Sequence, residues 1–502
     1  MIPLLALLAV SLHNPPPAQA SLAMNLAGPA DWNTELPFVD LFRFTREWIS
    51  QEEGKAWGQG PKLEVDGRGW VRRLPPGVFA ETFLTSYENH YPAGDYTVLY
   101  DGDGDLAFGN GAVTASAKGR MVLKVDPKRG PFNLQLRRTN PANPVRNIRV
   151  LLPGTEATYR TDPFNPAFLK RWQGVSALRF MDWMQTNDSK IRSWGDRPRL
   201  DDASWAPKGI PAEIMIDLAN RMKADAWFCV PHLADDGYVR SFAKLAAGRL
   251  DPSLRVYLEY SNEVWNGQFQ QQRYAGDQGL KAGVGEKHWE AGWHWYARRS
   301  GQIFDLWSAA FPKTRLVRVL ASQAGNAYVS DQILGFEGAA KKADALAIAP
   351  YMGFMPSPTG EPKASEVAGW SLDRLFATLR EKTLPESIGF IRDNKKVATR
   401  YGLPLIAYEG GQHLVGVAGG ENDESLTKLL NDANRDPRMG ALYDDYLKAW
   451  QKEGGGLFAN FSSIGPFSKW GSWGQLEYAD DNPAKAPKLA ALRRWAKSLG
   501  QF

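Results

Sequence analysis

The chain has 502 residues, of which 43% are hydrophobic and 23% charged, and this balance excludes disorder as its main character. The formal charge of +5 is spread along the whole length without a long basic run, so nucleic acid is a poor candidate partner. A single cysteine, Cys229, excludes a disulfide framework and a zinc site built from several cysteines. Six scattered histidines form no cluster typical of a metal site, and we expect neither metal nor cofactor.

The N-terminus is typical of an export signal. Residues Ile2–Leu12 are apolar apart from Ser11, and Ala18-Gln19-Ala20 follows a run of prolines. An apolar stretch of about 10 residues that ends in A-x-A fits a secretory signal cut after Ala20. We therefore expect residues 1–20 to be removed and the mature protein to be secreted or periplasmic. A short buried strand is the alternative, and no stretch is long and apolar enough to predict a membrane span.

The next part of the chain predicts one strand and then a separate module. Residues 21–60 contain the apolar strand Leu22–Leu26 and a lead-in. Residues 61–153 contain short alternating stretches, such as Tyr96–Tyr100 and Met121–Val125, with Gly, Asp and Pro between them. A period of two with such turn residues is typical of antiparallel strands that pack one face on a core. We therefore predict a β-sandwich over residues 61–153.

The predicted sandwich contains a candidate calcium loop. The run Asp101-Gly-Asp-Gly-Asp105 has the acidic spacing with which such a loop begins. However, Leu106 stands where the loop glycine belongs, and no Glu follows at the twelfth position. A solvated turn is therefore the favoured interpretation.

From residue 154 to residue 502 the pattern changes to alternating strands and helices. The predicted strands are Ser176–Met181, Ala226–Pro231, Arg255–Tyr260, Thr314–Leu320, Ala345–Ala349, Pro404–Tyr408 and Gly456–Phe461. They are short and apolar, as parallel strands buried on both faces should be. With Leu22–Leu26 as the first strand, they predict an α/β protein with a (β/α)₈ (TIM) barrel and an inserted or N-terminal antiparallel β-sandwich module. An open doubly wound sheet is the rival, but no nucleotide-binding glycine motif follows a strand.

Two of these strands end in a glutamate. The fourth strand is followed by Ser261-Asn-Glu263-Val-Trp-Asn266, and the seventh is followed by Glu409. Because the catalytic groups of a barrel gather at the carboxyl ends of its strands, we expect both carboxylates to face one pocket. Glycoside cleavage needs such a pair, in which one carboxyl protonates the leaving oxygen while the other attacks the anomeric carbon or activates water. The surroundings of the two groups must hold their pKa values apart.

The stretch from Ser261 to Asn266, with a second Glu at the end of strand seven, resembles the clan A glycoside hydrolases. These are retaining (β/α)₈ enzymes that include many cellulases, mannanases, xylanases and arabinofuranosidases. The resemblance implies that Glu263 is the general acid/base, that Glu409 is the nucleophile, and that Asn262 binds the sugar 2-hydroxyl. It further implies an oligosaccharide or polysaccharide as substrate.

The same resemblance implies further substrate-binding residues at the strand ends. Arg179 matches the arginine that these enzymes place beside the nucleophile, and Tyr351 matches the tyrosine that hydrogen-bonds it. Trp470 and Trp473 are both candidates for the aromatic floor of the cleaved sugar's subsite, and the sequence does not choose between them. The other expected contacts are His232, Trp265 and His413, with Asp182, Trp183 and Asn187 as a further candidate subsite.

Several alternatives stay open at this stage. Glu259 lies within strand four, where we expect it to face the helices or a salt bridge rather than substrate. The chain could be a non-catalytic carbohydrate-binding protein on the same fold, a transglycosylase or an inverting hydrolase. A Pro- and Gly-rich loop over Met352–Gly369 could close one end of the cleft and favour exo action, or the cleft could be open. The sandwich either binds glycan or braces the barrel, and bracing is favoured.

Overall fold

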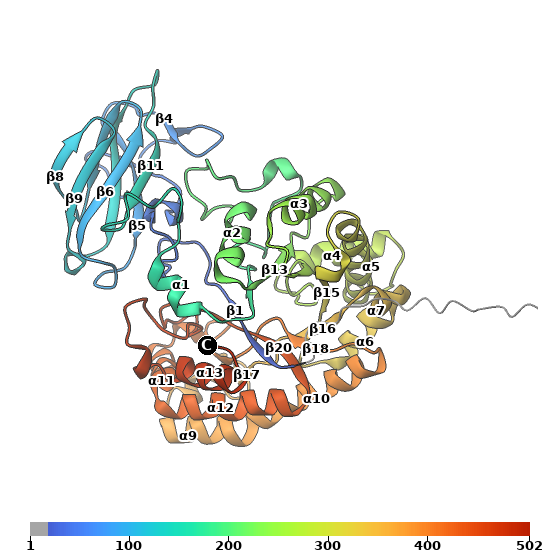
Figure 1. The fold of residues 1–502 in the computed structure, drawn as a ribbon. Helices are drawn as coiled ribbons and strands as arrows, with labels where there is room; N and C mark the ends of the chain where they lie inside the picture. The colour runs from blue at the N-terminus through green and yellow to red at the C-terminus, as the bar shows by residue number, and fades with distance from the viewer. Residues whose placement is uncertain (1–18) are drawn as a thin grey trace, which may run out of the picture.

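The computed structural model describes residues 19–502, so nearly all of the expected export signal, residues 1–20, lies outside the described residues. The larger part of the structure is a closed barrel of eight parallel strands (Figure 1). In spatial order these are β1 (Ser21–Asn25), β12 (Ala177–Arg179), β13 (Asp225–Val230), β14 (Val256–Tyr260), β15 (Leu316–Ala321), β16 (Ala345–Ile348), β18 (Leu405–Ala407) and β20 (Gly455–Asn460). The predicted TIM barrel is confirmed, and the open-sheet rival is wrong.

The N-terminal strand closes the barrel. On one side β1 pairs with β20, Ser21 opposite Leu457, and on the other side it pairs with β12, Met24 opposite Leu178. Both pairings are parallel, as are the six others around the barrel. The strands are apolar and almost wholly buried, because helices cover the outside and side chains fill the interior.

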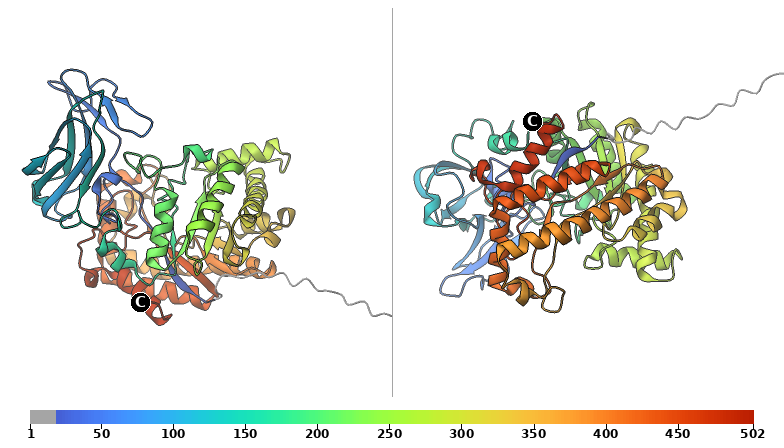
Figure 2. Two further views of the ribbon diagram at one scale, coloured as in Figure 1. Left: turned by 45° about the horizontal axis from the view of Figure 1, so that its top comes forward. Right: turned by 90° about the horizontal axis from the view of Figure 1, so that it is seen from below.

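Helices cover the outside of the barrel, and Figure 2 shows long helices lying across its lower side when the molecule is seen from below. The main ones are α1 (Pro166–Trp172), α2 (Ala212–Met222), α3 (Asp236–Arg249), α4 (Gln270–Lys281), α5 (His288–Ser308), α6 (Ala327–Gly335), α10 (Leu384–Arg400), α11 (Glu424–Arg435), α12 (Pro437–Lys452) and α13 (Pro487–Ser498). Shorter ones are α7 (Ala339–Lys342), α8 (Ala364–Val367) and α9 (Leu372–Thr378). Side-chain caps start several of them; Asp235, for example, accepts the backbone N–H of Tyr238 at the start of α3. Within residues 19–502 no helix is long and apolar enough to cross a membrane.

A β-sandwich is inserted between β1 and α1. One sheet has the order β2 (Ile49–Glu52), β5 (Val78–Thr85), β10 (Phe132–Thr139), β7 (Gly104–Phe108). The other has the order β11 (Arg146–Leu151), β6 (Gly94–Asp101), β9 (Arg120–Val125), β8 (Ala112–Ala117), and a hairpin of β3 (Glu64–Val65) and β4 (Val71–Arg73) is attached. The sandwich begins before residue 61, because β2 pairs antiparallel with β5, Gln51 opposite Phe79. The lead-in therefore supplies an edge strand that the alternation over residues 61–153 did not indicate.

The acidic run in the sandwich is a turn between its two sheets. Asp101 accepts a hydrogen bond from Asn147, Asp103 accepts one from Asn143, and Asp105 pairs with Arg138 at 2.6 Å. The three carboxylates thus have separate protein partners, which agrees with the turn interpretation rather than a calcium loop.

Insertion after β1 brings the sandwich to the carboxyl-end side of the barrel, since the chain leaves β1 at that end. In Figures 1 and 2 the sandwich stands beside the barrel rather than around it. Its β5–β6 connection contacts the segment after β20: the ring of His90 stacks on Tyr478 at 3.5 Å between centroids, and its Nδ1 lies 2.9 Å from Asp480. The loop that follows β12 also takes part, because Ala203 is buried in the sandwich core.

Candidate active site

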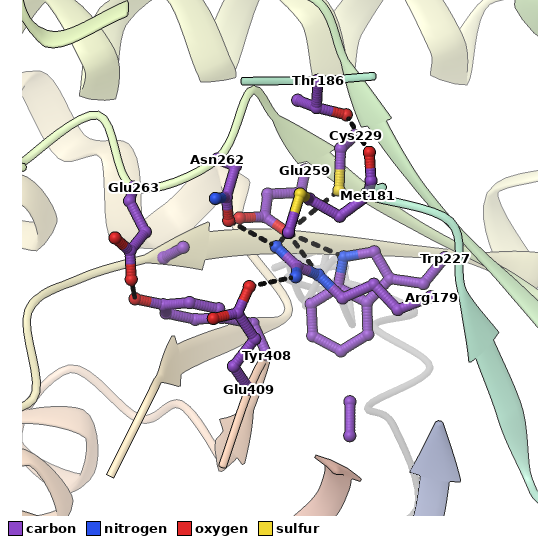
Figure 3. Close-up of polar contacts among 12 residues, drawn as sticks. Arg179, Met181, Thr186, Trp227, Cys229, Glu259, Asn262, Glu263, Tyr408 and Glu409 are labelled. Atoms are coloured by element: carbon purple, nitrogen blue, oxygen red, sulfur yellow. Dashed lines mark hydrogen bonds and ion pairs between the residues drawn. The ribbon is translucent and has the colours of Figure 1, made fainter. Parts of the chain in front are cut away.

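Glu409 follows β18 and has a hydrogen-bond donor on each carboxylate oxygen. Figure 3 shows the contact with Arg179. Arg179, the last residue of β12, donates from Nη1 to Oε1 at 2.9 Å. Tyr351, which lies between β16 and the short strand β17 (Met352–Phe354), donates its hydroxyl hydrogen to Oε2 at 2.9 Å. Glu409 is only 5% exposed, so these two donors replace water as its main partners.

Arg179 is fully buried and uses all five of its N–H groups. Besides Glu409, it donates from Nε and Nη2 to Glu259 Oε2 at 3.3 and 3.0 Å. It also donates to Asn25 Oδ1 at 3.0 Å and to Asn262 Oδ1 at 2.8 Å. Glu259 therefore faces the barrel interior in a salt bridge with Arg179, one of the two positions expected for it. Residues at the ends of three strands, β1, β14 and β18, therefore hold the guanidinium in one orientation.

Glu263 follows β14 in a turn of unusual backbone geometry. Ser261 and Glu263 both have positive φ values, 61° and 45°, which residues other than glycine adopt rarely and which cluster at functional sites. The Tyr408 hydroxyl donates to Glu263 Oε1 at 3.1 Å, and Asn266 Nδ2 donates to Oε2 at 2.9 Å. Sequence reasoning missed both donors. Tyr408 directly precedes Glu409, and Asn266 belongs to the stretch that identified Glu263.

The two carboxyls have different electrostatic surroundings. Burial and the nearby charge of Glu409 raise the pKa of Glu263 to about 7, and the hydrogen bonds from Asn266 and Tyr408 offset this only in part. Burial also raises the pKa of Glu409, but the guanidinium of Arg179 and the hydroxyl of Tyr351 oppose that shift. Because Glu409 has a cation at 2.9 Å and Glu263 has only neutral donors, Glu409 gives up its proton first. Near neutral pH the pair holds one anion and one acid.

Asn262 is oriented by a network of amides. Its Oδ1 accepts from Arg179, and its Nδ2 donates to Asn187 Oδ1 at 3.0 Å. Gln271, in α4, donates to the same Asn187 oxygen at 2.8 Å and to the backbone oxygen of Asn262 at 2.8 Å. The amide nitrogen of Asn262 therefore points away from Arg179. Of the other residues in the candidate subsite after strand two, Trp183 is fully buried and donates to Ala27 O, so it belongs to the core.

The structure separates the two tryptophans that the sequence did not distinguish. The ring of Trp473 lies 6.0 Å from that of Tyr351, whose hydroxyl donates to Glu409, and 4.8 Å from that of His413. Trp470 is 67% exposed and lies apart from this cluster, with the ammonium of Lys469 4.8 Å from its ring centroid. Trp473 is thus the tryptophan at the site.

The remaining predicted contacts are neutral groups around the strand ends. His413 lies in β19 (Gln412–Leu414) and packs edge-on against Tyr351, and burial lowers its pKa to about 4. His232, after β13, is 4% exposed, and burial lowers its pKa to about 4 as well. Trp265 is partly buried against the core beyond Glu263. None of these side chains carries a charge at neutral pH.

Among the residues that the structure describes, one group has donor atoms spaced closely enough to hold a metal ion. Ligand atoms of His90, Asp480 and Asp481 lie within 4.8 Å of one another, at the contact between sandwich and barrel. Asp481 already accepts the backbone N–H groups of Glu477 and Tyr478, and Asp480 pairs with His90. Because these side chains already bond to protein groups, we interpret the cluster as a polar contact between the sandwich and the barrel.

No family model matches the sequence, and no curated protein matches it. Among solved structures, a native Bacteroidetes-affiliated GH5 cellulase is 11% identical, with 66% of this chain and 85% of that chain covered and a TM-score of 0.38. A GH5-4 broad-specificity endoglucanase from Clostridium longisporum is 11% identical, with 66% and 98% covered and a TM-score of 0.36. A Bacteroides ovatus GH5 xyloglucanase is 8% identical, with 84% and 96% covered and a TM-score of 0.35. At these values the matches carry no argument about activity, which has to come from the site.

Proposed function

We propose that the chain is an exported, retaining glycoside hydrolase that acts on an oligosaccharide or polysaccharide. The observation that carries the proposal is the unequal setting of two carboxyls, one buried and one partly buried, at the same end of the barrel. Glu409 has a guanidinium and a tyrosine hydroxyl on its two oxygens, whereas the pKa of Glu263 is raised to about 7. Such a pair supplies an anion and an acid near neutral pH, as glycoside cleavage requires.

In the first step, Glu263 gives its proton to the glycosidic oxygen while the bond from that oxygen to the anomeric carbon breaks. The carboxylate of Glu409 forms a bond to the anomeric carbon from the opposite face, so an alcohol leaves and a glycosyl ester remains. In the second step, the ionised Glu263 takes a proton from water, whose oxygen attacks the anomeric carbon and displaces the Glu409 carboxylate. Two inversions at that carbon retain its configuration.

The surrounding groups support these roles. Arg179 and Tyr351 hold Glu409 in one orientation and favour its ionised form before attack and after release. Asn262 is held with its amide nitrogen away from Arg179, so its second N–H is free to donate to a sugar hydroxyl. Trp473 offers an aromatic face next to Tyr351, on which the apolar face of a sugar ring can stack.

The test is hydrolysis of a panel of polysaccharides and aryl glycosides by the protein that begins at Ser21, with Glu263→Gln and Glu409→Gln beside it. We expect the wild type to release sugar and each variant to lose activity by at least about 10²–10⁴-fold. The anomer that forms first, followed by NMR, should have the configuration of the substrate. Cleavage that survives both substitutions would contradict the carboxyl pair, and an inverted first product would contradict the double displacement.

Azide, added as an external nucleophile, distinguishes the acid/base role of Glu263 from the nucleophile role of Glu409. With a substrate that has a good leaving group, Glu263→Ala should still form the glycosyl ester and give a glycosyl azide of retained configuration. Glu409→Ala lacks the nucleophile and should give the azide of inverted configuration. Glycan binding without turnover by the wild type would favour a non-catalytic carbohydrate-binding protein. Export is tested separately, by the mass of the secreted chain, which should begin at Ser21.

A further inference from the structure

A third carboxyl, that of Asp182, lies at the same end of the barrel, three residues beyond Arg179. No hydrogen bond or ion pair within the described residues holds it, and its oxygens keep contact with solvent. Burial nevertheless raises its pKa to about 7, with a further rise from the charge of Glu409 and an opposing effect of Arg179. The side chain is thus surrounded by protein but still partly exposed, at the end of the barrel that also carries Glu409. Unpaired groups of this kind are costly to the fold.

The backbone holds Asp182 in place without using its side chain. The N–H of Met184 bonds to Phe180 O at 2.8 Å, and the N–H of Gln185 bonds to Asp182 O at 3.0 Å. Thr186 then donates its N–H and its hydroxyl to Met181 O, at 3.2 and 2.8 Å. Figure 3 shows Met181 and Thr186, the ends of this turn, joined by the hydrogen bond from the Thr186 hydroxyl. The carboxyl is therefore positioned by a closed turn and remains available to a ligand.

Arg179 has no N–H group left to donate to a ligand. Arg179 acts electrostatically on Asp182, Glu263 and Glu409. Its five N–H groups, however, are all taken, twice by Glu259 and once each by Asn25, Glu409 and Asn262. A carboxylate on the substrate would thus come close to three carboxyls, and Arg179 has no N–H left to donate to it. Desolvation and like charge both oppose that.

We infer that Asp182 binds the hydroxyl groups of an uncharged sugar beside the bond that is cleaved, and that it excludes uronic acids from this position. The inference rests on the proposed function and names the substrate class of that site. A carboxylate accepts hydrogen bonds from two sugar hydroxyls, and in its protonated form it still donates one. Asp182 is thus a specificity-determining residue that contacts substrate, distinct from the pair that breaks the bond.

The experiment compares polymers that differ only in charge. Wild type is first assayed on neutral polysaccharides and on polyuronates. The neutral hexose polymer that it cleaves is then selectively oxidised at its primary alcohols to carboxylates and assayed again. We expect cleavage of the neutral polymer and at least a tenfold lower kcat/KM after oxidation. Hydrolysis of a polyuronate, or equal rates before and after oxidation, would overturn the inference. If the wild type cleaved none of the polymers, that result would instead count against the proposed function.

Asp182→Asn isolates the side chain. On the neutral polymer we expect its kcat/KM to fall about 10- to 100-fold, the loss typical of a hydrogen bond to a charged group. The fall in kcat/KM caused by oxidation of the polymer should be smaller in this variant, because the Asp182 carboxylate no longer repels the carboxylates of the substrate. The matched control is Asp201→Asn, in the same loop after β12 but 62% exposed at its side chain and paired with Arg68, which should change neither value. An unchanged oxidation penalty in Asp182→Asn would overturn the role in charge selection.

Thermal unfolding provides a readout that does not depend on turnover. The folded-state pKa of Asp182 is raised from 3.8 to about 7, so its ionisation destabilises the fold progressively as pH rises from about 4 to about 7. Asp182→Asn should therefore match or exceed the wild-type Tm at pH 8. A clear loss of Tm would mean that the carboxyl serves the fold, and it would overturn the assignment to substrate.

Discussion

At the scale of single residues, Tyr408 connects the two halves of the site. It directly precedes Glu409 in the chain, yet its hydroxyl donates to Glu263, 145 residues away in sequence. Its ring lies against the guanidinium of Arg179, 5.1 Å from Cζ to the ring centroid. Successive residues of an extended segment point to opposite sides, so one strand end supplies Glu409 and also the side chain that holds Glu263.

Tyr408→Phe should move the alkaline limb of the pH profile. The hydroxyl stabilises the ionised form of Glu263 and so lowers its pKa, which burial has raised to about 7. Without it the pKa rises, Glu263 stays protonated to higher pH, and the alkaline limb of kcat/KM shifts upward while the acidic limb, set by Glu409, stays in place. Asn266→Ala removes the other donor and should shift the limb in the same direction. An alkaline limb that moves downward would contradict this role for Tyr408.

At the scale of elements, the segment after β20 places an aromatic ring at the site. The backbone oxygen of Ser472 accepts Gln412 Nε2 at 2.9 Å and Nζ of Lys488, from α13, at 2.5 Å. Lys488 is 1% exposed, and burial holds its pKa well below the ordinary value. These two side chains anchor the loop immediately before Trp473. Its indole N–H donates in turn to Trp470 O at 2.8 Å.

Trp473→Ala and Trp470→Ala should differ in their effect on turnover. Loss of the Trp473 ring removes the aromatic face beside Tyr351 and should lower kcat/KM about tenfold or more even for short aryl glycosides. Trp470 is 67% exposed and should matter little for such short substrates. Initial rates of both variants on one aryl glycoside decide this. Equal losses would show that the two rings act together, against the separation seen in the structure.

At the scale of the whole molecule, the sandwich and the barrel share apolar packing. The sandwich core includes Leu36, Leu41 and Phe42 of the lead-in and Ala203 of the loop after β12, all buried. A cavity of about 500 Å³ lies between the sandwich and that loop, lined by Trp48 and Lys208 among others. The shared packing supports the interpretation that the sandwich braces the barrel. If the sandwich instead bound glycan, this cavity would be the site.

Replacing residues 49–151 by a short linker should lower the Tm of the barrel. The deletion exposes the lead-in side chains that the sandwich buries, at about 25 cal/mol per Å² of apolar surface. Calorimetry should show one transition for the intact chain and a lower one for the deletion. Lys208→Ala changes the lining of the cavity at an exposed side chain and should keep both Tm and activity on polymers. A deletion that keeps its Tm but loses activity on polymers alone would identify the sandwich as a glycan-binding module.

The sequence by itself determined the barrel, the presence of an inserted sandwich and the strand ends that carry Glu263, Glu409, Arg179 and Tyr351. Each of these follows from local pattern: apolar runs set the strands, and a polar residue that ends such a run lies at the carboxyl end of the barrel. The edge strand Ile49–Glu52 was missed, because four residues are too few to show a clear alternation. The short paired strands β17 and β19 were missed for the same reason.

The tertiary structure alone decided which side chains meet. It chose Trp473 over Trp470, placed Trp183 in the core, and brought Tyr408 to Glu263 and Asn187 to Asn262. Within residues 19–502 it also left Asp182 without a hydrogen-bond partner, near a guanidinium whose donors are all occupied. Contacts between residues 75 to 230 positions apart have no periodicity to detect in the sequence. They depend on barrel closure, which brings the carboxyl ends of all eight strands to one face.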